Sequence, residues 1–445
     1  MKIIIAGAGA VGTHLAKMLS DERHDIVLMD AVEERLSNLD SNFDLMTIAA
    51  RPTSINSLKD AGVADADLFV AVTPEESTNI TSCMLAHSLG AKKTVARIDN
   101  YEYLQPKNKE FFRNLGIDSL IYPEMLAAKD IADGLRLSWI RQWWEFSGGA
   151  LVMLGVKLRE NALILNTPIY QLKKEQPYHI VAIKRMGETV IPGGNDELHA
   201  DDIVYFMTSK RSLSYIRKIT GKEAYATIRN VMMMGGSRIA MRATQLVSDD
   251  MSVKIIDSDL NRCHWLTDMV DDNVMVINGD GRDFELLNDE GISEVDAFVA
   301  LTDNSETNIL ACLAAKRMGV VKTIAEVENI DYIGMAESLD IGAIINKKKI
   351  AASYIYQLLL DADVENVKCL TFANADVAEC VVKENARVTR TLVKDISLPK
   401  GTTIGGLVRD DEGILVTCNT QIQAGDHVVV FCLSSMIKRI EKYFN

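Results

Sequence analysis

Three glycines near the N-terminus have the spacing of a turn that binds phosphate. Gly7, Gly9 and Gly12 form a G-x-G-x-x-G pattern directly after the apolar run 3–5, and Asp30 follows 23 residues beyond Gly7. In such a turn the first glycine permits the tight bend, the second lets backbone N–H groups approach a pyrophosphate, and the third lets a helix pack on its strand. The acidic residue accepts hydrogen bonds from the ribose hydroxyls of a dinucleotide.

This context predicts a nucleotide site in the first part of the chain. The negative charge of Asp30 repels a 2′-phosphate, which favours NAD over NADP. Thr73 and Arg97 are expected at the ends of the fourth and fifth strands, at the edge where open α/β sheets bind ligands. The alternative is that the glycines serve packing alone. The candidate residues are Gly7, Ala8, Gly9, Ala10, Val11, Gly12, Asp30, Thr73 and Arg97.

The elements that position these residues occur twice. Residues 67–104 align without a gap on 296–333, and 16 of the 38 positions are identical, from which we infer a duplication. Both halves begin with an apolar strand, a tight turn and a helix, at residues 1 and 230, and both continue to a strand that ends in an acid, Asp30 or Asp257. Strands that alternate with helices in this way predict a parallel sheet covered on both faces.

The second copy of the glycine turn is degenerate. Ser237 and Ala240 stand where the first copy has its second and third glycines, and each Cβ narrows the approach to a phosphate, although Arg238 adds a cation there. Glu326 stands where the first half has Arg97, so the charge is reversed. Two interpretations stay open, a second nucleotide site and a fold kept for assembly. The candidates are Gly235, Gly236, Ser237, Arg238, Ile239, Asp257, Asp280, Thr302 and Glu326.

Each half changes character after about 120 residues, from α/β alternation to short strands and turns. The segments 179–209 and 403–434 both read as a meander that closes on an acidic turn and a last apolar strand. We therefore predict an α/β protein with two Rossmann-like, doubly wound parallel-sheet domains, each followed by a small β-rich α+β domain. The expected domain boundaries are 1–137, 138–225, 226–360 and 361–445.

Composition excludes several classes of protein. The formal charge is −14 and the longest basic run is 347–349, so we expect no nucleic-acid partner. No apolar stretch approaches the ~20 residues that cross a bilayer, and no secretory signal is apparent, so a cytoplasmic protein is expected. The seven cysteines lack C-x-x-C spacing and nearby histidines, which favours reduced core thiols over disulfides or a metal site.

Residues for catalysis are not evident in the sequence. Hydride transfer needs an acid or base opposite the nicotinamide, and none of the histidines has a compelling position. We therefore expect a protein that is not an enzyme and assign no catalytic residue. An NAD-dependent oxidoreductase with duplicated Rossmann domains is the alternative, and a nucleotide sensor that acts on some other protein is a third possibility.

The whole pattern resembles the TrkA family, the cytosolic regulatory proteins of Trk potassium-uptake systems, whose domains are known as RCK domains. The specific matches are IIIAGAGAVG at 3–12, the strand ending at Asp30, FVAVT-x-x-x-x-TN at 69–79, ARI at 96–98 and AGDHVVVF at 424–431. The resemblance adds Pro74 to the first site and implies NAD or NADH as ligand, with ATP or ADP at the same or the second site. It also implies a homo-oligomeric ring, a tetramer, that gates a membrane potassium-translocating subunit of the Trk type from the inner face of the membrane.

Overall fold

A computed structural model describes residues 1–20, 24–37, 39, 43–172, 176–225, 227–359, 364–369, 375–433 and 437–444. These residues fall into two compact units. The first unit comprises Met1–Leu126 and Lys347–Leu359, and the second comprises Ala127–Asn346 and Leu360–Asn445.

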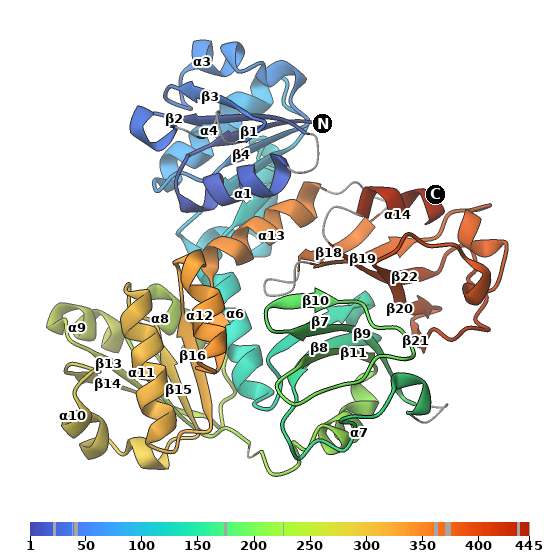
Figure 1. Ribbon diagram of the computed structural model, residues 1–445. Helices are drawn as coiled ribbons and strands as arrows, with labels where there is room; N and C mark the ends of the chain where they lie inside the picture. The colour runs from blue at the N-terminus through green and yellow to red at the C-terminus, as the bar shows by residue number, and fades with distance from the viewer. Residues whose placement is uncertain are drawn as a thin grey trace. The chain divides into compact units, whose positions relative to one another are not determined.

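The first unit contains a parallel sheet of six strands in the order β3-β2-β1-β4-β5-β6 (Figure 1). The chain starts in the middle of the sheet and winds outward to both sides, which is the doubly wound Rossmann order. The predicted fold class is confirmed here. The strands are β1 (Lys2–Ala6), β2 (Asp25–Asp30), β3 (Met46–Ala49), β4 (Leu68–Ala71), β5 (Thr94–Arg97) and β6 (Ser119–Ile121).

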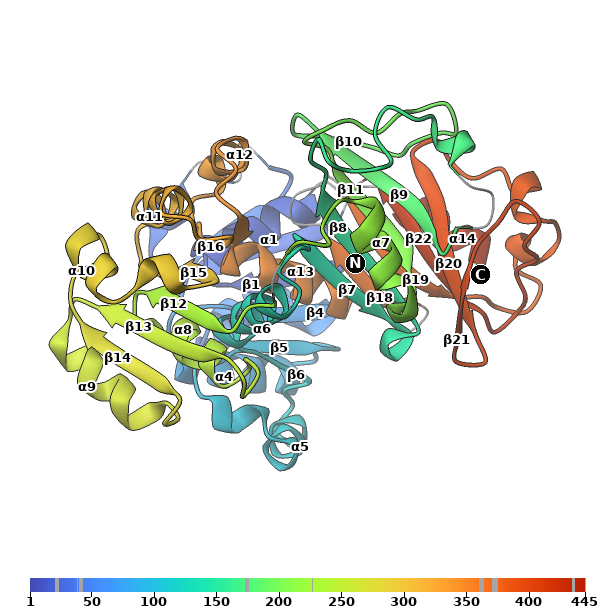
Figure 2. The ribbon, with the colours of Figure 1, turned by 90° about the horizontal axis from the view of Figure 1, so that it is seen from below.

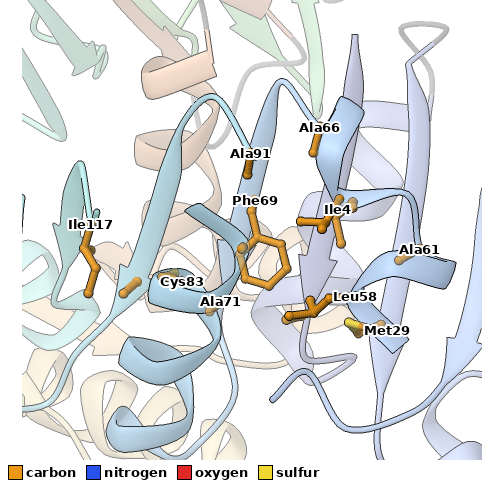
Figure 3. Packing of buried hydrophobic residues seen from close by; sticks show 14 of the residues in the cluster. Ile4, Met29, Leu58, Ala61, Ala66, Phe69, Ala71, Cys83, Ala91 and Ile117 are labelled. Atoms are coloured by element: carbon orange, nitrogen blue, oxygen red, sulfur yellow. The ribbon is translucent and has the colours of Figure 1, made fainter. Parts of the chain in front are cut away.

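Helices and short 3-10 turns accompany this sheet. The central strands are buried because the helices shield both faces, so their side chains read as continuous apolar runs. Figure 3 shows Phe69, Ile4 and Leu58 within one such core, which is among the buried clusters of the chain. The helical elements are α1 (Ala10–Ser20), η1 (Glu33–Arg35), α3 (Ile55–Asp60), η2 (Val63–Asp65), α4 (Glu76–Ser88), η3 (Tyr101–Leu104), α5 (Pro106–Asn114) and the start of α6 (Pro123–Arg136), which belongs to the second unit from Ala127 onward.

One helix joins the first unit from far along the sequence. Helix α13 (Lys347–Leu359) follows the second parallel sheet in the chain but packs on α1. Helix α6 makes the converse contact, since a Cβ on its Gly134 would lie 3.5 Å from Ile324 of β16 (Lys322–Glu326). Each parallel sheet therefore receives packing from a helix that the sequence assigns to the other half.

The second unit contains a parallel sheet with the matching order β14-β13-β12-β15-β16-β17. The matching order confirms the duplication that the sequence predicts. The strands besides β16 are β12 (Asn230–Met234), β13 (Ser252–Asp257), β14 (Val274–Asn278), β15 (Ala297–Ala300) and β17 (Ala343–Ile345). The helical elements are α8 (Arg238–Thr244), α9 (Leu260–Met269), α10 (Phe284–Asp289), η7 (Ile292–Glu294), α11 (Ser305–Arg317), η8 (Ile330–Tyr332) and α12 (Ile333–Ser338).

Two antiparallel sheets complete the second unit, in the orders β10-β9-β11-β8-β7 and β18-β19-β22-β20-β21. They confirm the predicted small β-rich domains. The first has β7 (Gln142–Phe146), η4 (Ser147–Gly149), β8 (Leu151–Lys157), η5 (Ile169–Gln171), β9 (Tyr178–Arg185), β10 (Glu188–Val190), β11 (Ile203–Thr208), η6 (Lys210–Ser212) and α7 (Leu213–Ile219). The second has β18 (Val364–Cys369), β19 (Ala375–Val381), η9 (Arg387–Thr389), η10 (Val393–Asp395), β20 (Thr402–Arg409), β21 (Glu412–Leu415), β22 (His427–Leu433) and α14 (Ile437–Phe444).

These two antiparallel sheets lie side by side (Figure 2). They share one apolar core. Tyr205 and Phe431 are fully buried, and their ring centroids lie 6.4 Å apart. A Cβ on Gly406 of β20 would approach Leu151 Cδ1 of β8 to 2.7 Å, so glycine is what permits the close approach. The small domains therefore pack on each other directly.

The predicted acidic turns bind an arginine in the same way in both small domains. Arg185 donates two hydrogen bonds to the Asp202 carboxylate, at 2.8 and 2.7 Å, and Arg409 donates two to Asp426, both at 2.7 Å. Both carboxylates are almost fully buried, and a buried charge must be paired to be tolerated. The acidic residue of each turn is therefore structural.

Cys83, Cys263, Cys312, Cys380 and Cys432 are buried thiols, whereas Cys418 is an exposed thiol; the side chain of Cys369 lies outside those described. Among the helices of the described segments, none is both long and apolar enough to span a bilayer.

Candidate functional site

The first glycine turn has the shape that the spacing predicts. Gly7 has φ of 112°, and a Cβ there would lie 2.9 Å from the backbone nitrogen of Thr73, so only glycine fits without strain. A Cβ on Gly12 would lie 1.9 Å from the carbonyl oxygen of Gly7. Because glycine has no Cβ, α1 can start directly behind the turn. A Cβ on Gly9 would meet nothing within 4 Å. The turn therefore leaves open space at the position where a pyrophosphate approaches.

Asp30 lies at the end of β2 and is held by the turn itself. Its Oδ2 accepts a hydrogen bond from the Ala8 backbone N–H at 2.7 Å, and its Oδ1 accepts one from Val32 N–H at 2.9 Å. A carboxylate oxygen has two acceptor positions, so each oxygen keeps one for a ribose hydroxyl. Arg35 Nη1 lies 3.6 Å from Asp30 Oδ2 and is half-exposed.

Thr73 and Arg97 are tied together by a residue between them in the sequence. The Asn79 Oδ1 accepts hydrogen bonds from Thr73 N–H at 2.9 Å and from its hydroxyl at 2.7 Å. The Asn79 Nδ2 donates to the carbonyls of Thr73 and Arg97, each at 3.0 Å. Because Gly7 also abuts Thr73, the structure brings the turn, the β4 end and the β5 end into one edge of the sheet.

The remaining first-half candidates have smaller parts in this edge. Arg97 Nη2 lies 3.5 Å from Glu124 Oε1 and 3.6 Å from Asp99 Oδ1, so its charge is partly satisfied within the first unit. Ala10 begins α1, and the side chain of Val11 is buried, so both offer a ligand only backbone groups. Pro74 is exposed in the loop after β4.

The second turn keeps the bend, but the Ser237 side chain occupies the position that Gly9 leaves open in the first turn. Gly235 has φ of 99°, and a Cβ there would lie 2.8 Å from the backbone of Leu301. Ser237 is the N-cap of α8, and its hydroxyl accepts a hydrogen bond from Ala240 N–H at 3.3 Å. A Cβ on Gly236 would lie 2.4 Å from Leu266 Cδ1. The serine thus satisfies one of the N–H groups that a bound phosphate would use.

Asp257 repeats the geometry of Asp30. Its Oδ2 accepts a hydrogen bond from Gly236 N–H at 2.6 Å, and its Oδ1 accepts one from Asp259 N–H at 2.8 Å. Asp280, beyond β14, forms a two-point ion pair with the exposed Arg282, which lowers the pKa of Asp280. Arg238 begins α8 and is exposed, whereas Ile239 is buried.

Thr302 and Glu326 are joined as their counterparts are. The Asn308 Oδ1 accepts from Thr302 N–H at 3.1 Å and from its hydroxyl at 2.6 Å. The Asn308 Nδ2 donates to Thr302 O at 2.8 Å and to Glu326 O at 2.9 Å. The Glu326 side chain is almost fully buried, so it is less accessible than an exposed ligand group would be.

Sequence reasoning missed the residues that hold these edges together. Asn79 and Asn308 belong to the identical Thr-Asn pair of the repeated block, and that identity was the signal that could have found them. Glu76 Oε2 accepts from Asp99 N–H at 2.6 Å, and Ser305 at the equivalent place accepts from Glu328 N–H at 3.0 Å. Arg35 lies close to Asp30 along the chain, but nothing in its local sequence marks it as a partner of that carboxylate.

Comparison with known families decides what kind of protein has this arrangement. The TrkA-N domain model matches residues 3–123 and 231–347, and the TrkA-C domain model matches residues 153–221 and 377–445. The chain belongs to the TrkA family. The matched segments alternate along the chain, as the duplicated architecture requires.

Full-length relatives support the TrkA assignment. The Trk system potassium uptake protein TrkA of Halomonas elongata is 30% identical over 100% of this chain and 98% of its own length. The protein of the same description from Vibrio alginolyticus is 32% identical over 98% of this chain and 96% of its own. The resemblance stated from the sequence is therefore confirmed.

Solved structures of similar fold come from a channel. The GsuK RCK domain covers 100% of this chain and 94% of its own, with a TM-score of 0.63 and 15% identity. The GsuK channel bound to NAD covers 100% of this chain and 78% of its own, with a TM-score of 0.62 and 15% identity. At these identities the likeness establishes the RCK fold of this TrkA-family chain.

A dinucleotide fits the first turn on the geometry alone. The open space at Gly9, the N–H groups at the start of α1 and the two anchored oxygens of Asp30 provide groups for a pyrophosphate and for ribose hydroxyls. In the second half, Asp257 corresponds to Asp30, but Ser237 already caps the helix that follows the turn. The two halves thus differ in the phosphate part of the candidate site and agree in the ribose part.

Proposed function

We propose that this chain is a nucleotide-sensing regulatory subunit of a membrane potassium-uptake system and that its first half binds NAD or NADH. The observation that carries the proposal is the open position at Gly9 in front of a complete glycine turn, with Asp30 anchored beside it. The descriptions of the relatives as potassium uptake proteins, and of a structure of similar fold as bound to NAD, support it.

The ligand works in this proposal by shifting a conformational equilibrium. A nucleotide that binds one shape of the assembly better than another moves the population toward that shape, whereas equal affinity moves nothing. The assembly is a homo-oligomeric ring, a tetramer, on the inner face of the membrane beneath a Trk-type potassium-translocating subunit. The protein is then a regulator without turnover, with domains 1–137, 138–225, 226–360 and 361–445.

ATP and ADP are the further ligands of the proposal, at the same turn or in the second half. A structure of similar fold described as GsuK bound to ADP supports an adenine nucleotide as the shared ligand class. The second half retains Asp257 for a ribose, whereas Ser237 competes with a phosphate for the N–H groups of α8. We therefore expect weaker phosphate recognition in the second half.

The first experiment is a calorimetric titration of the purified chain with NAD, NADH, NADPH, ATP and ADP. Asp30→Asn is expected to weaken the affinity for NADH about tenfold, because it removes the negative charge of the carboxylate that accepts hydrogen bonds from the ribose hydroxyls. Asp257→Asn is the matched control, since it makes the same change in the same geometry of the second half. Equal NADH affinity in Asp30→Asn and the wild type would contradict the assignment.

Two further measurements distinguish a regulator from an enzyme. Absorbance at the nicotinamide band is expected to stay constant, and steady NADH consumption would favour the oxidoreductase alternative. In vesicles that contain a Trk-type potassium subunit, we expect potassium flux to change with NADH only when this chain is present. A potassium flux that does not change with the nucleotide would contradict the gating proposal and would not affect the binding proposal.

A further inference from the structure

A cluster of basic side chains surrounds one carboxylate where the first antiparallel sheet meets the second parallel sheet. Asp340 follows α12, and its neighbours come from β8, α11, β16 and adjoining loops of the same compact unit. We name this cluster the basic junction. It consists of Arg141, Lys157, Arg159, Lys222, Lys316 and Lys322.

Four of these cations share the Asp340 carboxylate. Arg141 Nη2 lies 2.5 Å from Oδ1, and Lys157 Nζ lies 3.2 Å from the same oxygen. Lys316 Nζ lies 3.2 Å from Oδ2, which Arg159 also contacts. Although burial opposes it, this positive field holds the pKa of Asp340 well below its usual range. A single carboxylate therefore compensates four positive charges.

Within the described residues, Asp201 is the only other acidic residue that forms an ion pair with these cations. It lies 2.9 Å from Arg159 Nη1 and 3.3 Å from Lys157 Nζ. Its side chain is 69% exposed, so water screens most of its charge. The neighbouring pair of Lys184 and Glu337, at 2.8 Å, neutralises itself and leaves the balance unchanged.

Two members of the basic junction are buried amines whose hydrogen-bond partners are neutral. Lys222 is 3% exposed, and its Nζ donates to the Tyr225 hydroxyl at 3.2 Å. Lys322 donates to the carbonyl of Ile140 at 2.9 Å. In the part of the chain that the structure describes, neither amine forms an ion pair. Burial, with Arg159 and Arg141 nearby, lowers the pKa of Lys222 to about 8.

The fold itself does not require this charge. Lys157 pairs with Ile203 in the first small domain, and Val381 pairs with His427 at the corresponding place in the second. The strand therefore forms with an apolar residue at the position of Lys157. Asp340 has φ of 54°, a left-handed conformation that the first half gives to Gly116, with φ of 83°. An acidic side chain thus stands at a position whose left-handed conformation favours glycine. The charges have been gathered at this one junction.

We propose that the basic junction binds an oxyanion of the phosphate class through Arg159 and Lys316. These two side chains are 38% and 30% exposed, so an anion from solvent can reach them. A guanidinium presents the planar pair of donors that matches phosphate oxygens, and a dianion offsets the surplus charge. Because Arg159 follows β8 and Lys316 lies on α11, the anion bridges the first small domain and the second nucleotide-type domain. The proposal is independent of the glycine turns.

Thermal unfolding of the full chain tests this proposal. Sodium phosphate is added against sodium chloride of equal ionic strength, and the unfolding midpoint of the wild type is expected to rise with phosphate in a saturable way. Arg159→Gln is expected to weaken the apparent phosphate affinity about tenfold, since it removes a charge-assisted pair of hydrogen bonds. Lys383→Gln is the matched control, because Lys383 has the same place after β19 that Arg159 has after β8.

A second variant tests the proposal independently in case Arg159→Gln does not fold. Lys222→Met removes a buried charge while keeping the apolar stem, so the protein is expected to fold and to lose part of the phosphate effect. A phosphate effect of full size in both Arg159→Gln and Lys222→Met, or an equal loss in Lys383→Gln, overturns the proposal. Repeating the titration with ATP identifies the source: an Arg159-dependent effect of ATP alone assigns the site to a nucleotide phosphate, and one of inorganic phosphate assigns it to the free anion.

Discussion

The two glycine turns of this chain have the same bend and a different space in front of it. Gly7 and Gly235 both have positive φ, and a Cβ at either position would collide with the backbone that follows the neighbouring strand. At the second glycine position, Gly9 faces open space, whereas Ser237 caps its own helix. The bend is therefore a requirement of the fold, and the open space is the property that distinguishes a candidate phosphate site.

The largest expected effect comes from exchanging the third position of the two turns. Gly12→Ala is expected to destabilise the first parallel-sheet domain by about 3 kcal/mol or more, because its Cβ would collide with the Gly7 carbonyl. Ala240→Gly is expected to cost about 1 kcal/mol through helix propensity alone. Hydrogen exchange measured separately on peptides from β1–α1 and β12–α8 checks both values. Equal protection in the two variants would contradict the comparison.

The asparagine clamps are expected to matter equally in both halves. Asn79→Ala leaves the Thr73 N–H and two carbonyls without their partner, which is expected to cost about 2–3 kcal/mol. Asn308→Ala removes the same bonds in the second half and is expected to cost the same. Denaturant unfolding of both variants tests this. A cost in one half only would show that the shared edge is not a common structural device.

A pH dependence that originates from a histidine is expected in the first parallel-sheet domain. Burial, with Lys349 and Lys17 nearby, lowers the pKa of His14 to about 4 from 6.5. The unfolded chain therefore binds a proton before the folded chain does, so stability falls as pH decreases from about 6.5 toward 4, by about 2 kcal/mol at about pH 5. Arg242 has the equivalent place on α8.

His14→Gln is the variant that isolates this effect. It is expected to remove the pH-dependent difference in protection of β1–α1 peptides between about pH 8 and pH 5. The β12–α8 peptides serve as the internal reference, because they lack a histidine at this place. A wild-type profile that persists in the variant would assign the pH dependence to another group.

The smallest expected effect opens the second turn. Ser237→Gly removes the cap of α8 and is expected to change stability by only about 0.3 kcal/mol, since glycine is itself a fair N-cap. The same change frees the Ala240 N–H, so we expect the second half to bind ADP about threefold more tightly. Calorimetry in an Asp30→Asn background measures this without the first site. Unchanged affinity would mean that the cap does not limit phosphate access.

Much of the fold could be predicted because its signals are local. The glycine spacing, the acid at the end of the second strand and the alternation of strands with helices each lie within one short segment. The repeated block between 67–104 and 296–333 extended one prediction to both halves. Asn79, which completes the candidate site, was missed, because it joins Thr73 after β4 to the Arg97 carbonyl of β5 only when these two strands pair.

By itself, the sequence determined the two doubly wound sheets, the two small antiparallel domains and the difference between the turns, since hydrophobic period and glycine position fix these locally. Only the tertiary structure decided that α13 packs on α1 and that four basic side chains contact Asp340. Those contacts join residues as far apart as Arg141 and Asp340. No local pattern encodes such a pairing, because it depends on how the separate elements pack.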